Sequence, residues 1–295
     1  MPRPAPPIED RSVRANGVEF RVLSCGDGPL ALCFHGFPDS AHTWRHLLVQ
    51  LGTAGYRAVA PFQRGYAPTE VPADGLYQSG ALSMDAIALH EALGGGADAV
   101  LIGHDWGAPT VYGAAGHAPE RWRAVVSMAV PPGGAVAAAF LTNLRQIKRS
   151  WYMFFFQHPL ADLLVGANDL AYVDMLWADW SPSFDAAAEL ELLKPSLRDP
   201  SNLQAALGYY RARLGGGLID PALDAVQEAT QQIPPQRLLY LHGADDGCIG
   251  VEVAEAARGM VPGNVTIDIV DGAGHFLHLE RPDEVNRRIV EFLSP

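Results

Sequence analysis

Short apolar runs alternate with helix-like stretches through most of this 295-residue chain. Each run resembles a buried strand, and Gly or Pro often follows it closely. Strands that alternate with helices predict a parallel sheet with helices on both of its faces. We therefore expect an α/β fold built on one mostly parallel, twisted sheet. The predicted strands are LALCF at 30–34, YRAVAP at 56–61, AVLIG at 99–103, RAVVSMAV at 123–130, RLLYLHG at 237–243 and VTIDIV at 265–270.

The alternation stops after VPPGG at 130–134, and a long helical stretch with many aromatic residues follows. WYMFFFQ at 151–157 and MLWADW at 175–180 are its richest parts, and either could pack internally or cover an apolar pocket. We find no low-complexity linker that would tether a separate module. The sequence predicts a core made of residues 1–134 and 232–295, with a helical cap at 135–231 inserted between them.

Charge and hydropathy exclude several classes of partner. The formal charge is -12, from 33 acidic and 21 basic residues, and no cluster of Lys and Arg could neutralise a nucleic-acid backbone. No apolar run reaches the length of a membrane-spanning helix, and the first residues lack the apolar segment of a signal peptide. We expect a cytoplasmic enzyme without nucleic-acid or membrane partners, and a homodimer is one option for its assembly.

Neither cysteines nor histidines form a metal-binding motif. The cysteines are far apart in sequence, which predicts free thiols instead of disulfides or a zinc site. Three histidines near residue 40 lack the supporting carboxylate of a helical zinc motif, and no cofactor motif occurs. We expect no metal and no cofactor. These residues are Cys25, Cys33, Cys248, His35, His42 and His46.

The segment AVLIGHDWGAPTVYGAA has the order strand, sharp turn, helix, with Asp105 at the turn. Gly103 and Gly107 lie two residues to either side, as the close packing of a nucleophile elbow requires. A carboxylate is ionised at neutral pH and can attack a saturated, electrophilic carbon without a base. The ester formed must then be hydrolysed by activated water. The other interpretation of Asp105 is a helix N-cap.

Two further segments supply partners for Asp105. HGFPDS at 35–40 follows the first predicted strand, so the backbone N–H groups of Phe37 and Trp106 are candidates for an oxyanion hole. Near the C-terminus, His275 lies on a glycine-flanked loop after a strand, where a base could reach the sheet edge. His278 is the alternative base, although it falls where the last helix is expected to start.

The acid that orients the base should follow a strand between the nucleophile and the base, and RLLYLHGADDGC provides it. We favour Asp246, while Asp245 stays open as the alternative because spacing cannot separate adjacent carboxylates. The order Asp105, Asp246, His275 is that of nucleophile, acid and base in α/β hydrolases.

The chain resembles the α/β-hydrolase superfamily, and within it the epoxide hydrolases. The resemblance implies the α/β-hydrolase fold with an inserted cap, the pairing of Asp246 with His275, and two cap tyrosines that donate hydrogen bonds to the epoxide oxygen. By position these are Tyr152 and Tyr210, with Tyr209 as the open alternative to Tyr210. The matching motifs are HGFPDS, RGYAPTE at 64–70, GHDWGAP, SWYMFFFQ, GYYRA at 208–212 and AGHF.

These residues predict a hydrolase that adds water to a small apolar epoxide and releases a vicinal diol. Asp105 would form the covalent ester, the two phenols would protonate the ring oxygen, and His275 would activate water. We take His35, Trp151 and Phe155 as further substrate-binding candidates.

Two other functions compete with this prediction. Haloalkane and haloacid dehalogenases share the Asp nucleophile, but haloalkane dehalogenases usually have Asn where this chain has Phe37. Fluoroacetate dehalogenases carry arginines where this chain has Trp106 and Pro109, and a halide-binding Trp at the position of Tyr152, although Trp151 is adjacent. A ligand-binding receptor on a hydrolase scaffold is the non-enzyme alternative. One departure from the epoxide hydrolases, the missing Asp before RGY, leaves the packing near Gln63 and Arg64 open.

Overall fold

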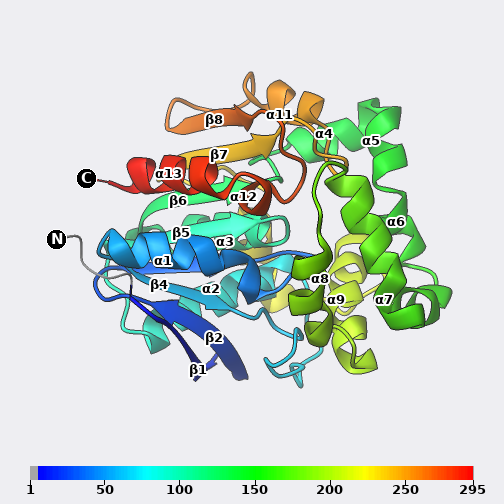
Figure 1. Cartoon of the computed structure of the whole chain (residues 1–295), viewed down its shortest axis with the longest axis horizontal. Coiled ribbons are helices and arrows are strands. Elements are labelled where there is room, and N and C mark those ends of the chain that lie inside the picture. Colours follow the sequence, from blue (N-terminus) through cyan, green and yellow to red (C-terminus); the bar gives the residue numbers. More distant parts are fainter. Residues whose placement is uncertain (1–5, 295) are drawn as a thin grey trace.

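One eight-stranded sheet runs through the computed structural model, which describes residues 6–294 (Figure 1). The strand order is β1-β2-β4-β3-β5-β6-β7-β8. From β4 to β8 neighbouring strands pair in parallel, whereas β1 and β2 pair antiparallel at one edge. The strands are β1 (Ile8–Ala15), β2 (Val18–Cys25), β3 (Leu30–Phe34), β4 (Arg57–Pro61), β5 (Ala99–His104), β6 (Trp122–Met128), β7 (Arg237–Gly243) and β8 (Val265–Val270).

The six predicted strands correspond to β3 through β8, and the predicted parallel sheet is confirmed. The sequence interpretation missed the hairpin of β1 and β2. β1 is almost fully exposed and rich in charged residues, so it lacks the apolar signal of a buried strand. Its turn holds Asn16 and Gly17 with φ of 46° and 76°. Asn-Gly is the strongest short-range hairpin signal, and it would have located this hairpin.

Helices cover both faces of the sheet, as predicted. On one face α1 (Arg45–Thr53) packs beside α13 (Pro282–Leu293), and on the other α2 (Ser79–Ala92) packs beside α3 (Gly107–His117). Side chains of a strand point alternately to the two faces. In β5, for example, Leu101 belongs to the apolar core under α2 and α3, while Ile102 belongs to the core under α1 and α13.

The chain between β6 and β7 is helical, and most of it lies beyond the carboxyl ends of the parallel strands (Figure 1). Its last helix packs back against α2 and α3. The helices of this stretch are α4 (Ala135–Thr142), α5 (Leu144–Arg149), α6 (Trp151–Phe155), α7 (Leu160–Trp180), α8 (Ala187–Leu193), α9 (Pro200–Leu214) and α10 (Asp224–Ala229). Elsewhere lie α11 (Val251–Ala257), α12 (Leu277–Glu280) and the 3-10 helices Ala41–Trp44 and Pro119–Arg121.

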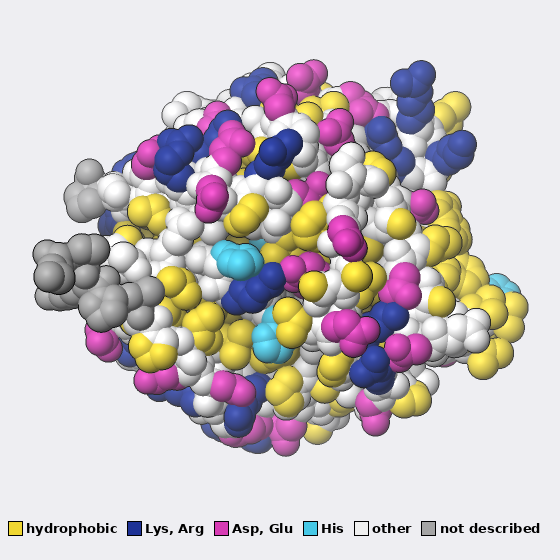
Figure 2. Space-filling view, in the orientation of Figure 1, with side chains coloured by type: hydrophobic (Ala, Val, Ile, Leu, Met, Phe, Trp, Pro, Cys, Tyr) yellow, Lys and Arg dark blue, Asp and Glu magenta, His cyan; other side chains and the backbone are white. Residues whose placement is uncertain are grey.

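Hydrophobic side chains gather on the outer surface of this helical stretch. Figure 2 shows them along the right-hand edge, in the region of α6 and α7, where Phe154, Leu160 and Leu163 are exposed. None of the helices in residues 6–294 combines the length and the apolar character needed to cross a lipid bilayer.

Candidate active site

Three of the predicted residues meet where parallel strands end. Asp105 follows β5, Asp246 follows β7 and His275 follows β8, and all three are buried. Parallel strands deliver the residues at their carboxyl ends to one edge of the sheet. His275 Nδ1 lies 3.0 Å from Asp246 Oδ2, and His275 Nε2 lies 3.7 Å from Asp105 Oδ2. The imidazole therefore stands between the two carboxylates.

The turn at Asp105 has the geometry of a nucleophile elbow. Asp105 has a φ of 50°, a left-handed conformation that residues with a side chain rarely adopt. A Cβ on Gly103 would collide with the Gly107 carbonyl, and one on Gly107 would collide with the Phe34 carbonyl. A Cβ on Gly36 would meet the Asp105 carboxylate itself. Only glycine at these three positions lets the turn pack this closely against the loop after β3.

Backbone N–H groups hold the Asp105 carboxylate. The Phe37 N–H donates to Oδ1 at 2.8 Å, and the Trp106 N–H also hydrogen-bonds the carboxylate. Oδ2 is the oxygen that faces His275. Burial raises the pKa of Asp105, while His275 and the two N–H groups oppose that rise by favouring the charged form. The two N–H groups are placed where negative charge on a tetrahedral intermediate would develop.

The structure distinguishes Asp246 from its neighbour. Asp246 Oδ1 accepts hydrogen bonds from the N–H groups of Cys248 at 2.7 Å and Ile249 at 2.9 Å, and Oδ2 faces His275. Asp245 is exposed to solvent. The structure thus places Asp246, and not Asp245, in contact with the imidazole.

Opposing influences act on His275. Its burial would lower the pKa, but the charge and hydrogen bond of Asp246, together with Asp105, raise it above its ordinary value of 6.5. His278 lies elsewhere, because its Nε2 is 2.5 Å from Thr43 Oγ1 and its ring stacks on Trp44. Burial lowers the pKa of His278 to about 3, which leaves it neutral. His275 is therefore the histidine that can exchange a proton next to Asp105.

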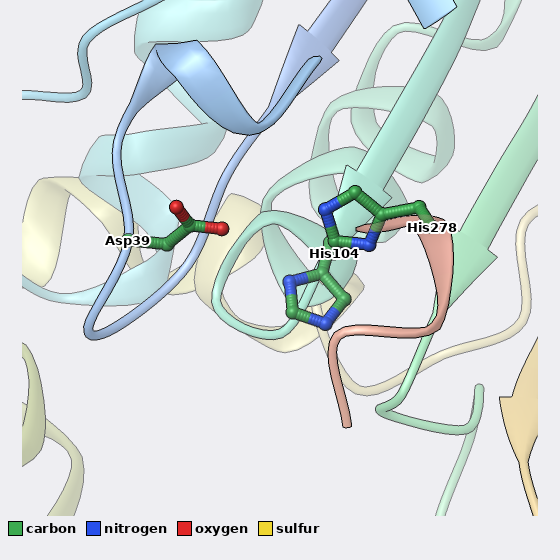
Figure 3. A group of neighbouring side chains, drawn as sticks. All are labelled: Asp39, His104 and His278. Carbon is green, nitrogen blue, oxygen red and sulfur yellow. The ribbon is translucent and has the colours of Figure 1, made fainter. Parts of the chain in front are cut away.

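Behind the nucleophile, three buried residues form a second polar cluster: Asp39, His104 and His278 (Figure 3). The two imidazole rings lie next to each other, and the Asp39 carboxyl group points toward them. These side-chain types can bind a metal ion such as Zn²⁺, and their ligand atoms lie within 4.8 Å of one another. Burial raises the pKa of Asp39 to about 8, so its carboxyl is mostly protonated at neutral pH. The sequence analysis missed this cluster because its members are far apart along the chain.

Two tyrosines of the helical stretch face the nucleophile across a cavity of about 500 Å³. Tyr152 on α6 and Tyr210 on α9 both line this cavity together with Asp105, and their rings meet edge to face at 5.6 Å. The Tyr152 hydroxyl lies 3.4 Å from Cys248 Sγ. The buried Tyr210 hydroxyl is near the Trp106 indole but completes no hydrogen bond among residues 6–294.

Tyr209 points away from the cavity. Its hydroxyl donates to the Arg64 carbonyl at 2.8 Å, and it does not line the cavity wall. Arg64 itself is buried and donates two hydrogen bonds to Asp85, each at 2.6 Å. This pair is the packing partner near Arg64 that the sequence analysis left open. Burial raises the pKa of Tyr152 and of Tyr210 well above the ordinary value, so both phenols keep their protons at neutral pH.

The remaining predicted substrate-binding residues lie outside the cavity wall. His35 is buried between the Gly36 carbonyl and the Gln63 N–H. Trp151 is 44% exposed, and it packs with Phe155 around Tyr172. α4 and the end of α9 supply wall residues that the sequence analysis did not identify. They are Val136, Ala137, Phe140, Leu141, Arg213 and Leu214.

Comparisons with known proteins agree with this geometry. Residues 29–282 match the family model of the alpha/beta hydrolase fold. The chain is 30% identical to epoxide hydrolase A of Mycobacterium tuberculosis, with 97% of both chains covered. It is also 30% identical to an epoxide hydrolase of Caballeronia sordidicola, with 97% of this chain and 94% of that one covered.

A solved structure extends the similarity to three dimensions. The crystal structure of an epoxide hydrolase of Bacillus megaterium in complex with an inhibitor superimposes with a TM-score of 0.81 at 26% identity. The match covers 97% of this chain and 100% of that one. The full-length match, the nucleophile elbow and the carboxylates on either side of His275 have one common explanation. The chain belongs to the α/β-hydrolase fold family and, within it, to the epoxide hydrolases.

Proposed function

We propose that this protein adds water to an epoxide and releases a vicinal diol, through a covalent ester between the substrate and Asp105. One observation carries the proposal: the Asp105 carboxylate and the side chains of Tyr152 and Tyr210 line one cavity. A nucleophile that faces two phenols suits the opening of a strained ring, because the ring oxygen needs a proton donor as its bond breaks. The mostly apolar wall favours small apolar epoxides.

In the first step, a carboxylate oxygen of Asp105 attacks a ring carbon and the carbon–oxygen bond of the ring breaks. The freed oxygen takes a proton from Tyr152 or Tyr210, which leaves a phenolate. The raised pKa of both phenols supports this role, since the donors stay protonated up to high pH. The product of this step is a hydroxyalkyl ester on Asp105.

In the second step, His275 takes a proton from water, and the hydroxide adds to the ester carbonyl carbon. The N–H groups of Phe37 and Trp106 hold the oxyanion that forms. The intermediate then expels the diol oxygen, which takes the proton from His275. The proton released as Asp105 regains its carboxylate returns to the phenolate. The contact between Asp246 and His275 supports the role of Asp246 in holding the base.

We also propose that residues 135–231 act as a cap over the core of residues 1–134 and 232–295. Tyr152 and Tyr210 come from this segment, whereas Asp105 comes from the core. The division separates the group that attacks carbon from the groups that polarise oxygen. Exchange of the cap between relatives would then change which epoxides are accepted without a change in the reaction.

The decisive experiment compares wild type with Tyr152→Phe, Tyr210→Phe and the double variant. Styrene oxide tests diol formation and bromobutane tests halide release. We expect diol formation to fall by about 10²–10⁴-fold in the double variant, since general acid catalysis contributes that much. Tyr209→Phe is the matched control, because it removes an adjacent phenol that faces Arg64. Halide release that survives in the double variant, without diol formation in wild type, would make the protein a dehalogenase instead.

A further inference from the structure

A thiol group in the cavity wall contacts one of the two phenols. Cys248 lines the same cavity as Asp105 and Tyr152, and its Sγ lies 3.4 Å from the Tyr152 hydroxyl. The two groups share one hydrogen bond, in which either atom can be the donor. Within residues 6–294 this hydroxyl is the hydrogen-bond partner of the thiol, and Sγ has no second one. The direction of the bond decides how the thiol acts on the reaction.

The backbone of Cys248 is held from two sides. Its N–H donates to Asp246 Oδ1 at 2.7 Å, and its carbonyl accepts from Gln146 Nε2 at 2.9 Å. The residue is 2% exposed, so the thiol faces the phenol instead of bulk solvent. Burial raises the pKa of the thiol well above its ordinary value, and the carboxylates of Asp246 and Asp105 raise it further. The group therefore keeps its S–H hydrogen at neutral pH.

The two phenols of the cavity differ in their partners. Tyr152 has the thiol of Cys248, whereas the Tyr210 hydroxyl completes no hydrogen bond among residues 6–294. A phenol that gives up its proton becomes a buried phenolate, and a buried charge without a hydrogen-bond donor is costly. A phenolate can only accept hydrogen bonds, so the thiol must then be the donor. This contact favours a phenolate on Tyr152 over one on Tyr210.

We propose that Cys248 donates its S–H to the Tyr152 oxygen and thereby makes Tyr152 the phenol that protonates the ring oxygen. The inference rests on the proposed function. In the free enzyme this bond leaves the phenolic hydrogen of Tyr152 to face the cavity. When the carbon–oxygen bond of the ring breaks, that hydrogen moves to the freed oxygen, and the thiol proton stays on sulfur. Tyr210 donates a hydrogen bond to the same oxygen and keeps its proton. Cys248 is thus a positioning residue.

The alternative is that Cys248 only fills space beside Tyr152. The Tyr152 ring also packs against Phe156 and Trp180, with centroids 5.5 Å and 5.0 Å away. A residue that fills space acts through its apolar volume, so valine would replace it better than serine. A residue that donates a hydrogen bond acts through its hydrogen, so serine would replace it better than valine. The two interpretations therefore predict opposite orders for the two variants.

Ring opening can be measured alone in the His275→Gln background, where the ester on Asp105 accumulates. Cys248→Val should slow ester formation by about tenfold, the lower end for a hydrogen bond to a charged group, because a thiol is a weak donor. Cys248→Ser should keep most of the rate. Cys33→Val is the matched control, since Cys33 is buried in β3 and does not line the cavity. A slower reaction in the serine variant than in the valine variant would overturn the proposal.

A double-mutant cycle in the same background tests whether the thiol acts through Tyr152. Tyr152→Phe removes the acceptor, so adding Cys248→Val should cost nothing further. In Tyr210→Phe, by contrast, Cys248→Val should still cost about tenfold. Tyr152→Phe alone should slow ester formation more than Tyr210→Phe alone. Equal losses from Cys248→Val in both backgrounds, or a larger effect of Tyr210→Phe, would contradict the assignment.

Infrared spectroscopy tests the contact without turnover, because the S–H stretching band lies in a region with few other protein bands. The band that disappears in Cys248→Val belongs to this thiol. It should move to higher frequency in Tyr152→Phe, since hydrogen bonding lowers the stretching frequency of a donor. Tyr209→Phe is the control, because that hydroxyl faces Arg64. An unmoved band contradicts the S–H donor. A shifted band without an ester from any epoxide in His275→Gln contradicts the proposed function and leaves the contact in place.

Discussion

The floor and the roof of the cavity are built by different physical means. We define the floor as Asp105, which lines the cavity, together with Asp246 and His275 behind it, and the roof as Tyr152 and Tyr210. The floor residues follow parallel strands and are held by short hydrogen bonds, such as the 2.7 Å bond from Cys248 N–H to Asp246. The roof residues come from helices and are held mainly by packing of their aromatic rings, and the centroids of the Tyr152 and Tyr210 rings lie 5.6 Å apart.

This difference indicates which part of the site tolerates change. Hydrogen bonds to backbone groups depend on direction and fix the floor to the sheet. Ring packing is less directional, so the roof can shift with the helices that carry it. The Tyr210 hydroxyl completes no hydrogen bond within residues 6–294, and it can donate to a ligand without breaking an internal bond. A rigid floor suits one reaction, and an adaptable roof suits a choice of substrates.

The largest expected effect is on turnover, and it comes from replacing His275, the general base of the floor. His275→Gln should lower turnover by about 10⁴-fold or more, as loss of a member of a catalytic triad does. Because the first step does not need the base, the ester should accumulate as a mass increase on Asp105, measurable by mass spectrometry of peptides. His278→Gln is the control, since that histidine faces Thr43. Normal turnover in His275→Gln would remove His275 from the mechanism.

The next effect tests the acid of the floor. Asp246→Asn should lower kcat by about 10³–10⁴-fold, because the amide favours the wrong imidazole tautomer. Asp245→Asn changes the exposed neighbour in the same way and should stay within about twofold of wild type. Steady-state kinetics on one epoxide decides between them. A larger loss in Asp245→Asn would reverse the assignment of the two carboxylates.

The third prediction concerns the pH dependence of the floor. His275 must be neutral to activate water, so ester hydrolysis is lost as pH falls through its pKa. Asp105 helps to raise that pKa in the free enzyme, and esterification removes its negative charge. The acid limb of single-turnover ester hydrolysis should therefore lie at lower pH than the titration of His275 in free enzyme, followed by NMR. Coincident midpoints would contradict this coupling.

The smallest expected effect is on stability, and it concerns the link between α5 and the loop after β7. Gln146 of α5 is fully buried, and it donates to the Cys248 carbonyl at 2.9 Å and accepts from the Gly250 N–H at 3.0 Å. Gln146→Leu leaves both groups without partners and should cost about 1–3 kcal/mol of unfolding free energy. Chemical denaturation measures this cost, with Gln204→Leu on the exposed face of α9 as the control. Equal stability of both variants would show that the link contributes little.

The sequence predicted the buried parts of the fold better than its exposed edge. β3 to β7 are mostly apolar and buried, because helices cover both of their faces, whereas the edge strand β8 is only partly buried. β1 is exposed on both sides, and its charged residues give no apolar pattern from which a strand could be predicted. The residues of the cavity wall were harder still to predict from the sequence. Arg213 has no motif of its own, and the only signal was its spacing of three residues from Tyr210.

By itself, the sequence determined the order of the strands β3 to β8 and of the helices that alternate with them, the elbow at Asp105 and the loop that carries His275. These features depend on local spacing and on glycines that no other residue can replace. Only the tertiary structure decided between Asp245 and Asp246 and between Tyr209 and Tyr210. Neighbouring residues on a helix point about 100° apart, so the docking of α9 on the core selects the phenol that enters the cavity. Similarly, the turn after β7 selects the carboxylate that meets His275. Its conformation is set by distant segments, because the Asp245 N–H donates to the Ala273 carbonyl and the Gly247 N–H donates to the Trp180 carbonyl.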